Sequence, residues 1–96
     1  MGDDRARCER EVAGLVVDEL DGRDWALESA CLSVREVAHR LGISTAGAAG
    51  AISRLVSDGR LRCYSAPPTG RAGDDERLLA LAPTPALMRE LGREVY

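Results

Sequence analysis

Arginine is the residue type of this sequence whose number and spacing best suit a chemical task. All 13 of the Lys and Arg residues are Arg. Six of them lie between residues 31 and 73, at Arg35, Arg40, Arg54, Arg60, Arg62 and Arg71. A guanidinium group binds phosphate through several parallel hydrogen bonds. This stretch of the chain therefore predicts a surface for a partner that carries phosphate groups.

The charges are divided unevenly along the 96 residues, although the formal net charge is −3. Residues 1–30 hold nine acids and four Arg, a net charge of −5. Residues 31–73 hold two acids and six Arg, a net charge of +4, and residues 74–96 hold five acids and three Arg, a net charge of −2. Clustered positive charge matters more for phosphate binding than the total does. An acidic protein with this basic stretch therefore remains a candidate for binding nucleic acid.

Residues for other kinds of chemistry are scarce. The one His, His39, is expected on the solvated side of a helix, and Cys8, Cys31 and Cys63 form no C-x-x-C pair. The sequence also lacks a nucleophile elbow and a glycine-rich phosphate loop with Lys. We therefore expect no catalytic residue, no metal site and no cofactor, and three reduced thiols. Since no stretch approaches the roughly 18 apolar residues of a membrane span, we expect a cytoplasmic protein without a membrane partner.

The spacing of apolar residues predicts four helices. They cover residues 4–21, 33–41, 44–57 and 85–95. In each, apolar residues recur every three or four positions, as on a helix that buries one face. Because aromatic residues make up only 3% of the chain and Phe is absent, we expect a core of Leu, Val, Ile and Ala.

Capping residues mark where these helices begin. The run SVRE, which starts at Ser33, is a capping box in which a hydroxyl and a carboxylate each bond a backbone N–H. Ser44 and Thr84 stand at equivalent starts of the third and fourth helices. Asp3 or Asp4 can cap the first helix. A glycine follows both the first and the second helix, and we expect each of them to end there.

After the third helix the pattern changes to that of strands. Residues 61–65 and 76–82 are short strand-like runs, and they flank the loop 66–75, APPTGRAGDD. The Pro, Gly and Asp residues of this loop predict a hairpin. The segment before the second helix is ambiguous: Asp24 can cap a short helix there, or residues 30–32 can form a brief strand.

The order helix, helix, turn, helix, strand, loop, strand, helix resembles that of winged helix-turn-helix domains. The runs that carry the resemblance are LSVREVAHRLGIS, AISRLVSDGRL and RLLALAP, which contain A-x-x-L-G-I-S followed by L-x-x-x-G-x-L. They span about residues 31–82, and RLLALAPTPAL is similar to the wing exit of the MarR-like regulators. The resemblance implies a single domain over residues 1–96, mainly α with a small β-hairpin wing at about 61–82. It would be built as a three-helix core plus a C-terminal helix.

The resemblance also implies a function and the residues that perform it. Helix 44–57 would enter the major groove of double-stranded DNA, and the wing loop 66–75 would reach the minor groove. The protein would be a homodimer paired through its N- and C-terminal helices, and a transcriptional repressor that acts by occupying its site. The residues expected at the DNA are Ser33, Arg35, Arg40, Ser44, Thr45, Ala46, Ala49, Gly50, Ser53, Arg54, Arg60, Arg62 and Arg71.

The outward face of helix 44–57 is unusual for this role. It carries Ala46, Gly50 and Ser53, and only Arg54, at its edge, is long enough to read a base. Two hypotheses therefore stay open. In one, the small side chains let the helix lie deep in the groove while arginines hold the phosphates. In the other, the small residues admit the close approach of another protein, and the domain is a protein–protein interaction module.

Overall fold

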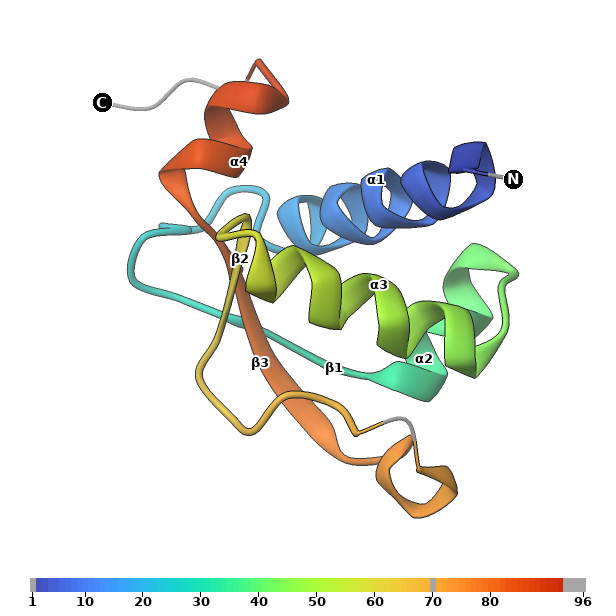
Figure 1. Ribbon diagram of the computed structural model, residues 1–96. Helices are drawn as coiled ribbons and strands as arrows, with labels where there is room; N and C mark the ends of the chain where they lie inside the picture. The colour runs from blue at the N-terminus through green and yellow to red at the C-terminus, as the bar shows by residue number, and fades with distance from the viewer. Residues whose placement is uncertain (1, 70, 93–96) are drawn as a thin grey trace.

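Helices and antiparallel strands make up the computed structural model, which describes residues 2–69 and 71–92 (Figure 1). The α-helices of this described part are α1 (Gly2–Glu19), α2 (Val34–Leu41), α3 (Thr45–Ser57) and α4 (Pro85–Glu90). The strands are β1 (Ala30–Ser33), β2 (Leu61–Cys63) and β3 (Leu78–Pro83), and a short 3-10 helix, η1 (Ala72–Asp74), precedes β3. Together they form a small α/β domain.

The three strands form one antiparallel sheet in the order β1-β3-β2. In the central strand β3, Leu81 lies opposite Ala30 of β1 and Cys63 of β2. Successive side chains point to opposite faces of a strand, so Leu79 and Leu81 are buried while Leu78 is 62% exposed. The helices α1 and α3 pack against each other, α1 also meets β3, and α2 packs on α3 (Figure 1). The aliphatic core therefore lies between these helices and the inner face of the sheet.

The segment before α2 is a strand, which resolves the ambiguity left by its sequence. Asp24 begins a turn, in which its Oδ1 accepts the N–H of Ala26 at 3.1 Å. From Ala30 to Ser33 the chain pairs with β3 as β1. The sheet is thus larger by one strand than the predicted hairpin of β2 and β3, and this third strand leads directly into α2.

The turn between α2 and α3 is fixed by the predicted caps. The hydroxyl of Ser33 accepts the N–H of Glu36 at 3.1 Å, and that of Ser44 accepts the N–H of Gly47 at 2.9 Å. Only the hydroxyl half of the capping box forms. The Glu36 carboxylate lies 3.5 Å from Nε of Arg40 instead of bonding the N–H of Ser33. Gly42 ends α2 with a φ of 67°, the left-handed conformation that glycine adopts at no steric cost.

Two glycine substitutions are expected to have opposite effects on stability. Gly42→Ala places a side chain at a φ of 67°, and we expect it to lower the free energy of unfolding by about 1–2 kcal/mol. Gly14 lies within α1, where a Cβ would meet no neighbouring element within 4 Å, so Gly14→Ala should raise it by about 0.5–1 kcal/mol. Urea unfolding of the two variants measures both changes. A Gly42→Ala protein as stable as the wild type would contradict the left-handed turn.

The first helix differs from its predicted bounds. It begins at Gly2, so Asp3 and Asp4 lie within its first turn and not at the position before its start. It ends at Glu19 rather than at residue 21, and a turn that contains Gly22 follows. Neither α1 nor any other helix of the described residues combines the length and the apolar character needed to cross a membrane.

The last helix begins as predicted and ends early. The Thr84 hydroxyl accepts the N–H of Leu87 at 3.3 Å and so caps α4. The helix ends at Glu90 instead of residue 95, because Gly92 takes a φ of 74° that an α-helix cannot contain. The rest of the predicted helix, residues 93–96, lies outside the described part of the chain.

Candidate functional site

The helix α3 has a face of small residues, as its sequence predicts. Its buried residues are Ala48, Ala49, Ala51, Ile52 and Leu55. Ala46 is exposed, and Gly50 and Ser53 are half-buried on the other side. Ala49, one of the residues expected at the DNA, is only 5% exposed. The outward face of α3 is therefore narrower than the sequence suggests.

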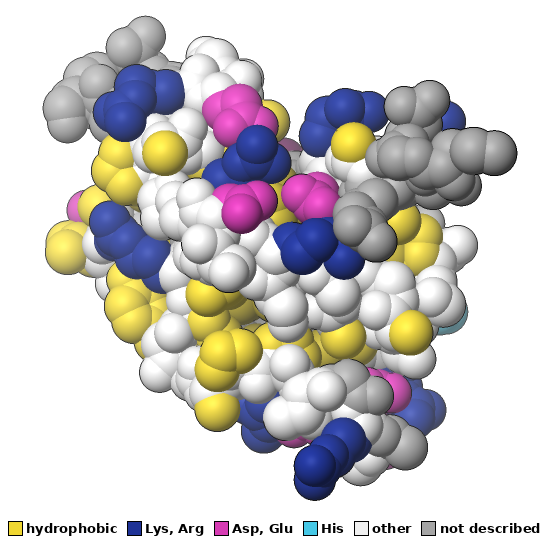
Figure 2. Space-filling view, in the orientation of Figure 1, with side chains coloured by type: hydrophobic (Ala, Val, Ile, Leu, Met, Phe, Trp, Pro, Cys, Tyr) yellow, Lys and Arg dark blue, Asp and Glu magenta, His cyan; other side chains and the backbone are white. Residues whose placement is uncertain are grey.

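A shallow pocket of about 220 Å³ lies between this face and the loop after β2. Its lining residues are Ala46, Ala49, Gly50, Ser53, Pro68 and Thr69. None of these side chains is charged, and the two hydroxyls are the polar groups that they offer. In Figure 2, hydrophobic side chains gather below α3, toward the loop. The pocket joins α3 and the loop 66–75 into one surface, and no motif in the sequence indicates that Pro68 and Thr69 take part.

The loop is held in place by Arg77 and Asp74. The Arg77 guanidinium donates from Nε to Asp74 Oδ1 at 2.6 Å and from Nη2 to Oδ2 at 3.0 Å. It also donates to the carbonyl oxygens of Ala66 and Pro67, at 2.8 and 3.0 Å. Asp74 Oδ2 in turn accepts the N–H of Thr69 at 2.8 Å. These bonds position Pro68 and Thr69 against α3. The only sign of this ion pair in the sequence is the three-residue spacing of Asp74 and Arg77.

A pH-dependent effect on stability is expected from Asp74. Its bonds from Arg77, and then that from Thr69, hold the pKa of Asp74 below its usual range. A carboxylate with a lowered folded-state pKa stabilises the protein above its unfolded pKa of about 4, and this contribution is lost as the pH falls toward the folded value. Asp74→Asn should therefore lower Tm at pH 7, and the difference from wild type should shrink below about pH 4.

The matched control for this prediction is Asp75→Asn. Asp75 contributes its backbone carbonyl, which accepts the N–H of Arg35 at 2.9 Å, and the substitution leaves that bond intact. Thermal unfolding followed by circular dichroism between pH 3 and 7 measures Tm for both variants. An Asp74→Asn protein whose Tm deficit is the same at pH 3 and pH 7 would contradict the role given to the carboxylate.

Three of the arginines expected at DNA make close ion pairs, at 3.3 Å or less, with carboxylates of the chain itself. Arg54 Nε lies 2.6 Å from Glu9 Oε2, and Arg40 Nη1 lies 2.7 Å from Glu19 Oε2. Arg60 Nη1 lies 3.8 Å from Glu9 Oε1, and Arg60 Nε lies 3.3 Å from Glu90 Oε2 on α4. Because α1 packs along α3, the acidic and basic stretches that are separate in the sequence meet in the fold. These arginines are thus not the freely available phosphate ligands that the sequence predicts.

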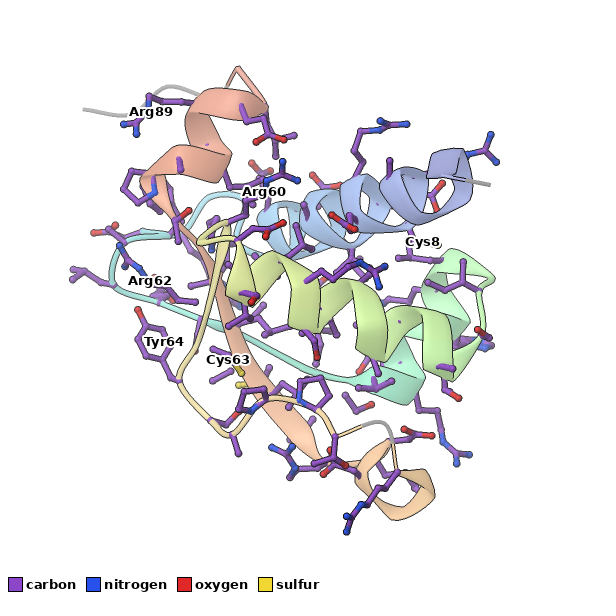
Figure 3. The ribbon with its side chains drawn as sticks, in the orientation of Figure 1. Cys8, Arg60, Arg62, Cys63, Tyr64 and Arg89 are labelled. Atoms are coloured by element: carbon purple, nitrogen blue, oxygen red, sulfur yellow. The ribbon has the colours of Figure 1, made fainter. Side chains whose placement is uncertain are left out.

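The other three arginines lie in different places. Arg35, at the start of α2, is 64% exposed, with its Nη2 3.9 Å from Glu76 Oε2. Arg71 is exposed in the loop 66–75, and the Arg35 N–H bond to the loop brings these two arginines to the same end of the molecule. Arg62, on β2, projects with Tyr64 from the sheet and away from α3 (Figure 3). The predicted set therefore divides, and Arg62 does not join the α3 surface.

The hydroxyl residues of the predicted site mostly serve the fold. Ser33 is buried and its Oγ caps α2, so it is not placed as a surface ligand. Ser44 is exposed, and its Oγ caps α3 at the end of the helix that faces solvent. Thr45, the first residue of α3, is half-buried. Of these three, Ser44 and Thr45 lie at the N-terminus of α3, next to Ala46.

The two glycines of α3 make room for a side chain of the same helix and for the side chain that caps it. Each costs about 1 kcal/mol relative to Ala in a helix. A Cβ at Gly50 would lie 3.1 Å from Nη1 of Arg54, and a Cβ at Gly47 would lie 3.1 Å from Oγ of Ser44. Gly50 thus lets the Arg54 guanidinium lie along α3 beside the pocket.

No family model, curated protein or solved structure matches this chain. Its function must therefore be inferred from the geometry of α3, the loop and the arginines around them.

Proposed function

We propose that this protein is a winged helix-turn-helix regulator that binds double-stranded DNA. In this proposal α3 lies in the major groove and the loop 66–75 reaches the minor groove. The observation that carries it is the single surface formed by the N-terminal half of α3 and the loop, with Arg35 and Arg71 at the same end. By occupying its site the protein would act as a repressor.

The side chains of α3 suit a mode of binding with little base reading. Ala46, Gly50 and Ser53 lack the long donors and acceptors that distinguish bases, but they allow the helix backbone to lie close to the DNA. The N-terminus of a helix also attracts phosphate through its free N–H groups. Arg71 would supply a minor-groove contact, and Arg35, whose ion pair with Glu76 is exposed and 3.9 Å long, would exchange that carboxylate for a phosphate. We therefore expect modest sequence specificity.

The homodimer is a further part of the proposal. Two copies would present two α3 helices about one turn of DNA apart. Most apolar side chains of α1 and α4, including Leu87 and Met88, are buried against the rest of the same chain. Leu91, at the end of α4, is 36% exposed and is an apolar side chain that this end offers to a second copy. Sedimentation equilibrium gives the mass of the species directly.

A second candidate function has an observation of its own. The pocket beside α3 is uncharged, and Arg54, at its edge, is paired with Glu9. A neutral pocket of this size suits an apolar side chain of another protein better than it suits a phosphate. In this alternative the domain is a protein–protein interaction module that uses the small-residue face of α3.

Removing Arg71 is the test of the DNA-binding proposal. Arg71→Ala should lower affinity for duplex DNA severalfold and flatten the log–log salt dependence by about one unit, the loss of one phosphate contact. Arg89→Ala is the control, since Arg89 projects from α4 at the opposite end of the molecule (Figure 3). Fluorescence anisotropy of a labelled duplex measures both. Equal effects of the two substitutions, or no binding by the wild type at low salt, would overturn the proposal.

A further inference from the structure

Glu9 of α1 lies at the centre of a charge network that joins three helices. Its Oε2 accepts a hydrogen bond from Nε of Arg54 at 2.6 Å, and its Oε1 lies 3.8 Å from Nη1 of Arg60. Arg60 Nε lies 3.3 Å from Glu90 Oε2 on α4. The four charges sum to zero. The network therefore joins α1, α3 and α4, and its own charges add no net positive charge to this side of α3.

The position of Arg54 connects this network to the proposed DNA surface. Its Nη1 lies close to Gly50, and Gly50 lines the pocket between α3 and the loop. The side chain of Arg54 is 35% exposed, whereas that of Glu9 is only 13% exposed. A guanidinium that meets solvent at the edge of the site is thus held from behind by a carboxylate that solvent barely reaches.

A phosphate cannot easily take Arg54 away from Glu9. The carboxylate is already in place on the same chain. Moving the arginine would leave this largely buried charge with only its longer contact to Arg60, at 3.8 Å, which is unfavourable. The Nη groups of Arg54 can still face a phosphate, but the charge of Glu9 a few ångströms behind them cancels most of the attraction.

We propose that Glu9 is a positioning residue of the DNA-binding surface, which holds Arg54 beside Gly50 and withholds its charge from phosphate. This inference rests on the proposed function. It means that the wild-type protein binds DNA more weakly, and with a smaller salt dependence, than its arginines allow. Glu9 would then set the affinity at a level from which the protein can dissociate.

The test is the substitution Glu9→Gln, which keeps the shape of the side chain and an oxygen that can accept from Arg54. Without the carboxylate charge, the positive charge of Arg54 is no longer offset by Glu9 and can attract phosphate. Affinity for a labelled duplex should rise about tenfold at 0.1 M salt, and the log–log salt slope should steepen by about one unit. Glu11→Gln is the matched control, because Glu11 is exposed on the same helix and the substitution changes the net charge equally.

A double substitution separates a direct effect of Glu9 from a general one. In Glu9→Gln/Arg54→Gln two uncharged side chains replace an ion pair of zero net charge, so the net charge stays that of the wild type. Affinity for DNA should therefore return to within about twofold of the wild-type value. Tm of each variant shows whether it remains folded. Should Glu9→Gln alone fail to fold, the double variant still tests the proposal, because an affinity well below that of the wild type would mean that Arg54 already holds a phosphate.

The outcomes distinguish this inference from the function on which it rests. Wild-type binding with equal effects of Glu9→Gln and Glu11→Gln would overturn the role of Glu9 and leave the DNA-binding function standing. Absence of DNA binding by the wild type and by every variant would overturn both. A rise that is specific to Glu9→Gln and absent from the double variant would support both.

Discussion

Replacing Ala46 with Glu is expected to abolish binding of duplex DNA, with a fall in affinity of about a hundredfold or more, because like charges brought together at an interface cost several kcal/mol. Ala46 is the exposed second residue of α3 and lines the pocket. The substitution should leave the fold intact, since an acidic residue in the first turn of a helix is favourable. Fluorescence anisotropy with a labelled duplex measures the affinity, and circular dichroism checks the fold.

The variants Ala46→Arg and Ala46→Gln separate the two candidate functions. If α3 contacts DNA, the Arg variant should bind more tightly than the wild type, and the Gln variant should lie near it. If the face instead receives an apolar side chain of a protein, all three large polar residues should block that partner, whatever their charge. Unchanged DNA affinity in the Glu variant would mean that DNA binds elsewhere on the molecule.

The second large effect is on stability. Ile52 is fully buried and holds α3 against the core, so Ile52→Ala removes apolar contacts and leaves a cavity. We expect the free energy of unfolding to fall by about 2–5 kcal/mol, a large part of what a domain of this size has.

Ile52→Val is the matched substitution, and we expect it to cost about 0.5–1.5 kcal/mol. Urea unfolding compares the two variants, provided that the slope of the free energy of unfolding against urea concentration is the same for both. A loss in the Ala variant no greater than that in the Val variant would show that α3 is not anchored at this residue, and the placement of the candidate surface would have to change.

Local signals in the sequence predicted the central part of the fold. Ser33 and Ser44 cap α2 and α3 as expected, and Gly42 adopts the left-handed conformation that ends α2. Each of these features depends on residues within four positions of one another, so the sequence contains the whole interaction. The early end of α4 is of the same kind, because Gly92 lies within the apolar spacing of residues 85–95 and its left-handed conformation ends the helix.

Contacts between distant residues could not be predicted in this way. Glu9 and Arg54 are 45 positions apart, and nothing near either residue indicates that α1 packs along α3 with these two in register. The same holds for Ala49, whose burial follows from packing that its own helix does not determine. Counting charges along the chain therefore overstated the positive charge that the folded surface presents.

The measurement that tests the proposed function most directly is a titration of ¹⁵N-labelled protein with duplex DNA, followed by amide chemical shifts. We predict the largest shifts at the N-terminal half of α3, from Thr45 to Ser53, and in the loop around Thr69 and Arg71. The amides of α4 should change little. Shifts confined to α1 and α4, or no shifts at low salt, would contradict the assignment of α3 and the loop as the DNA-binding surface.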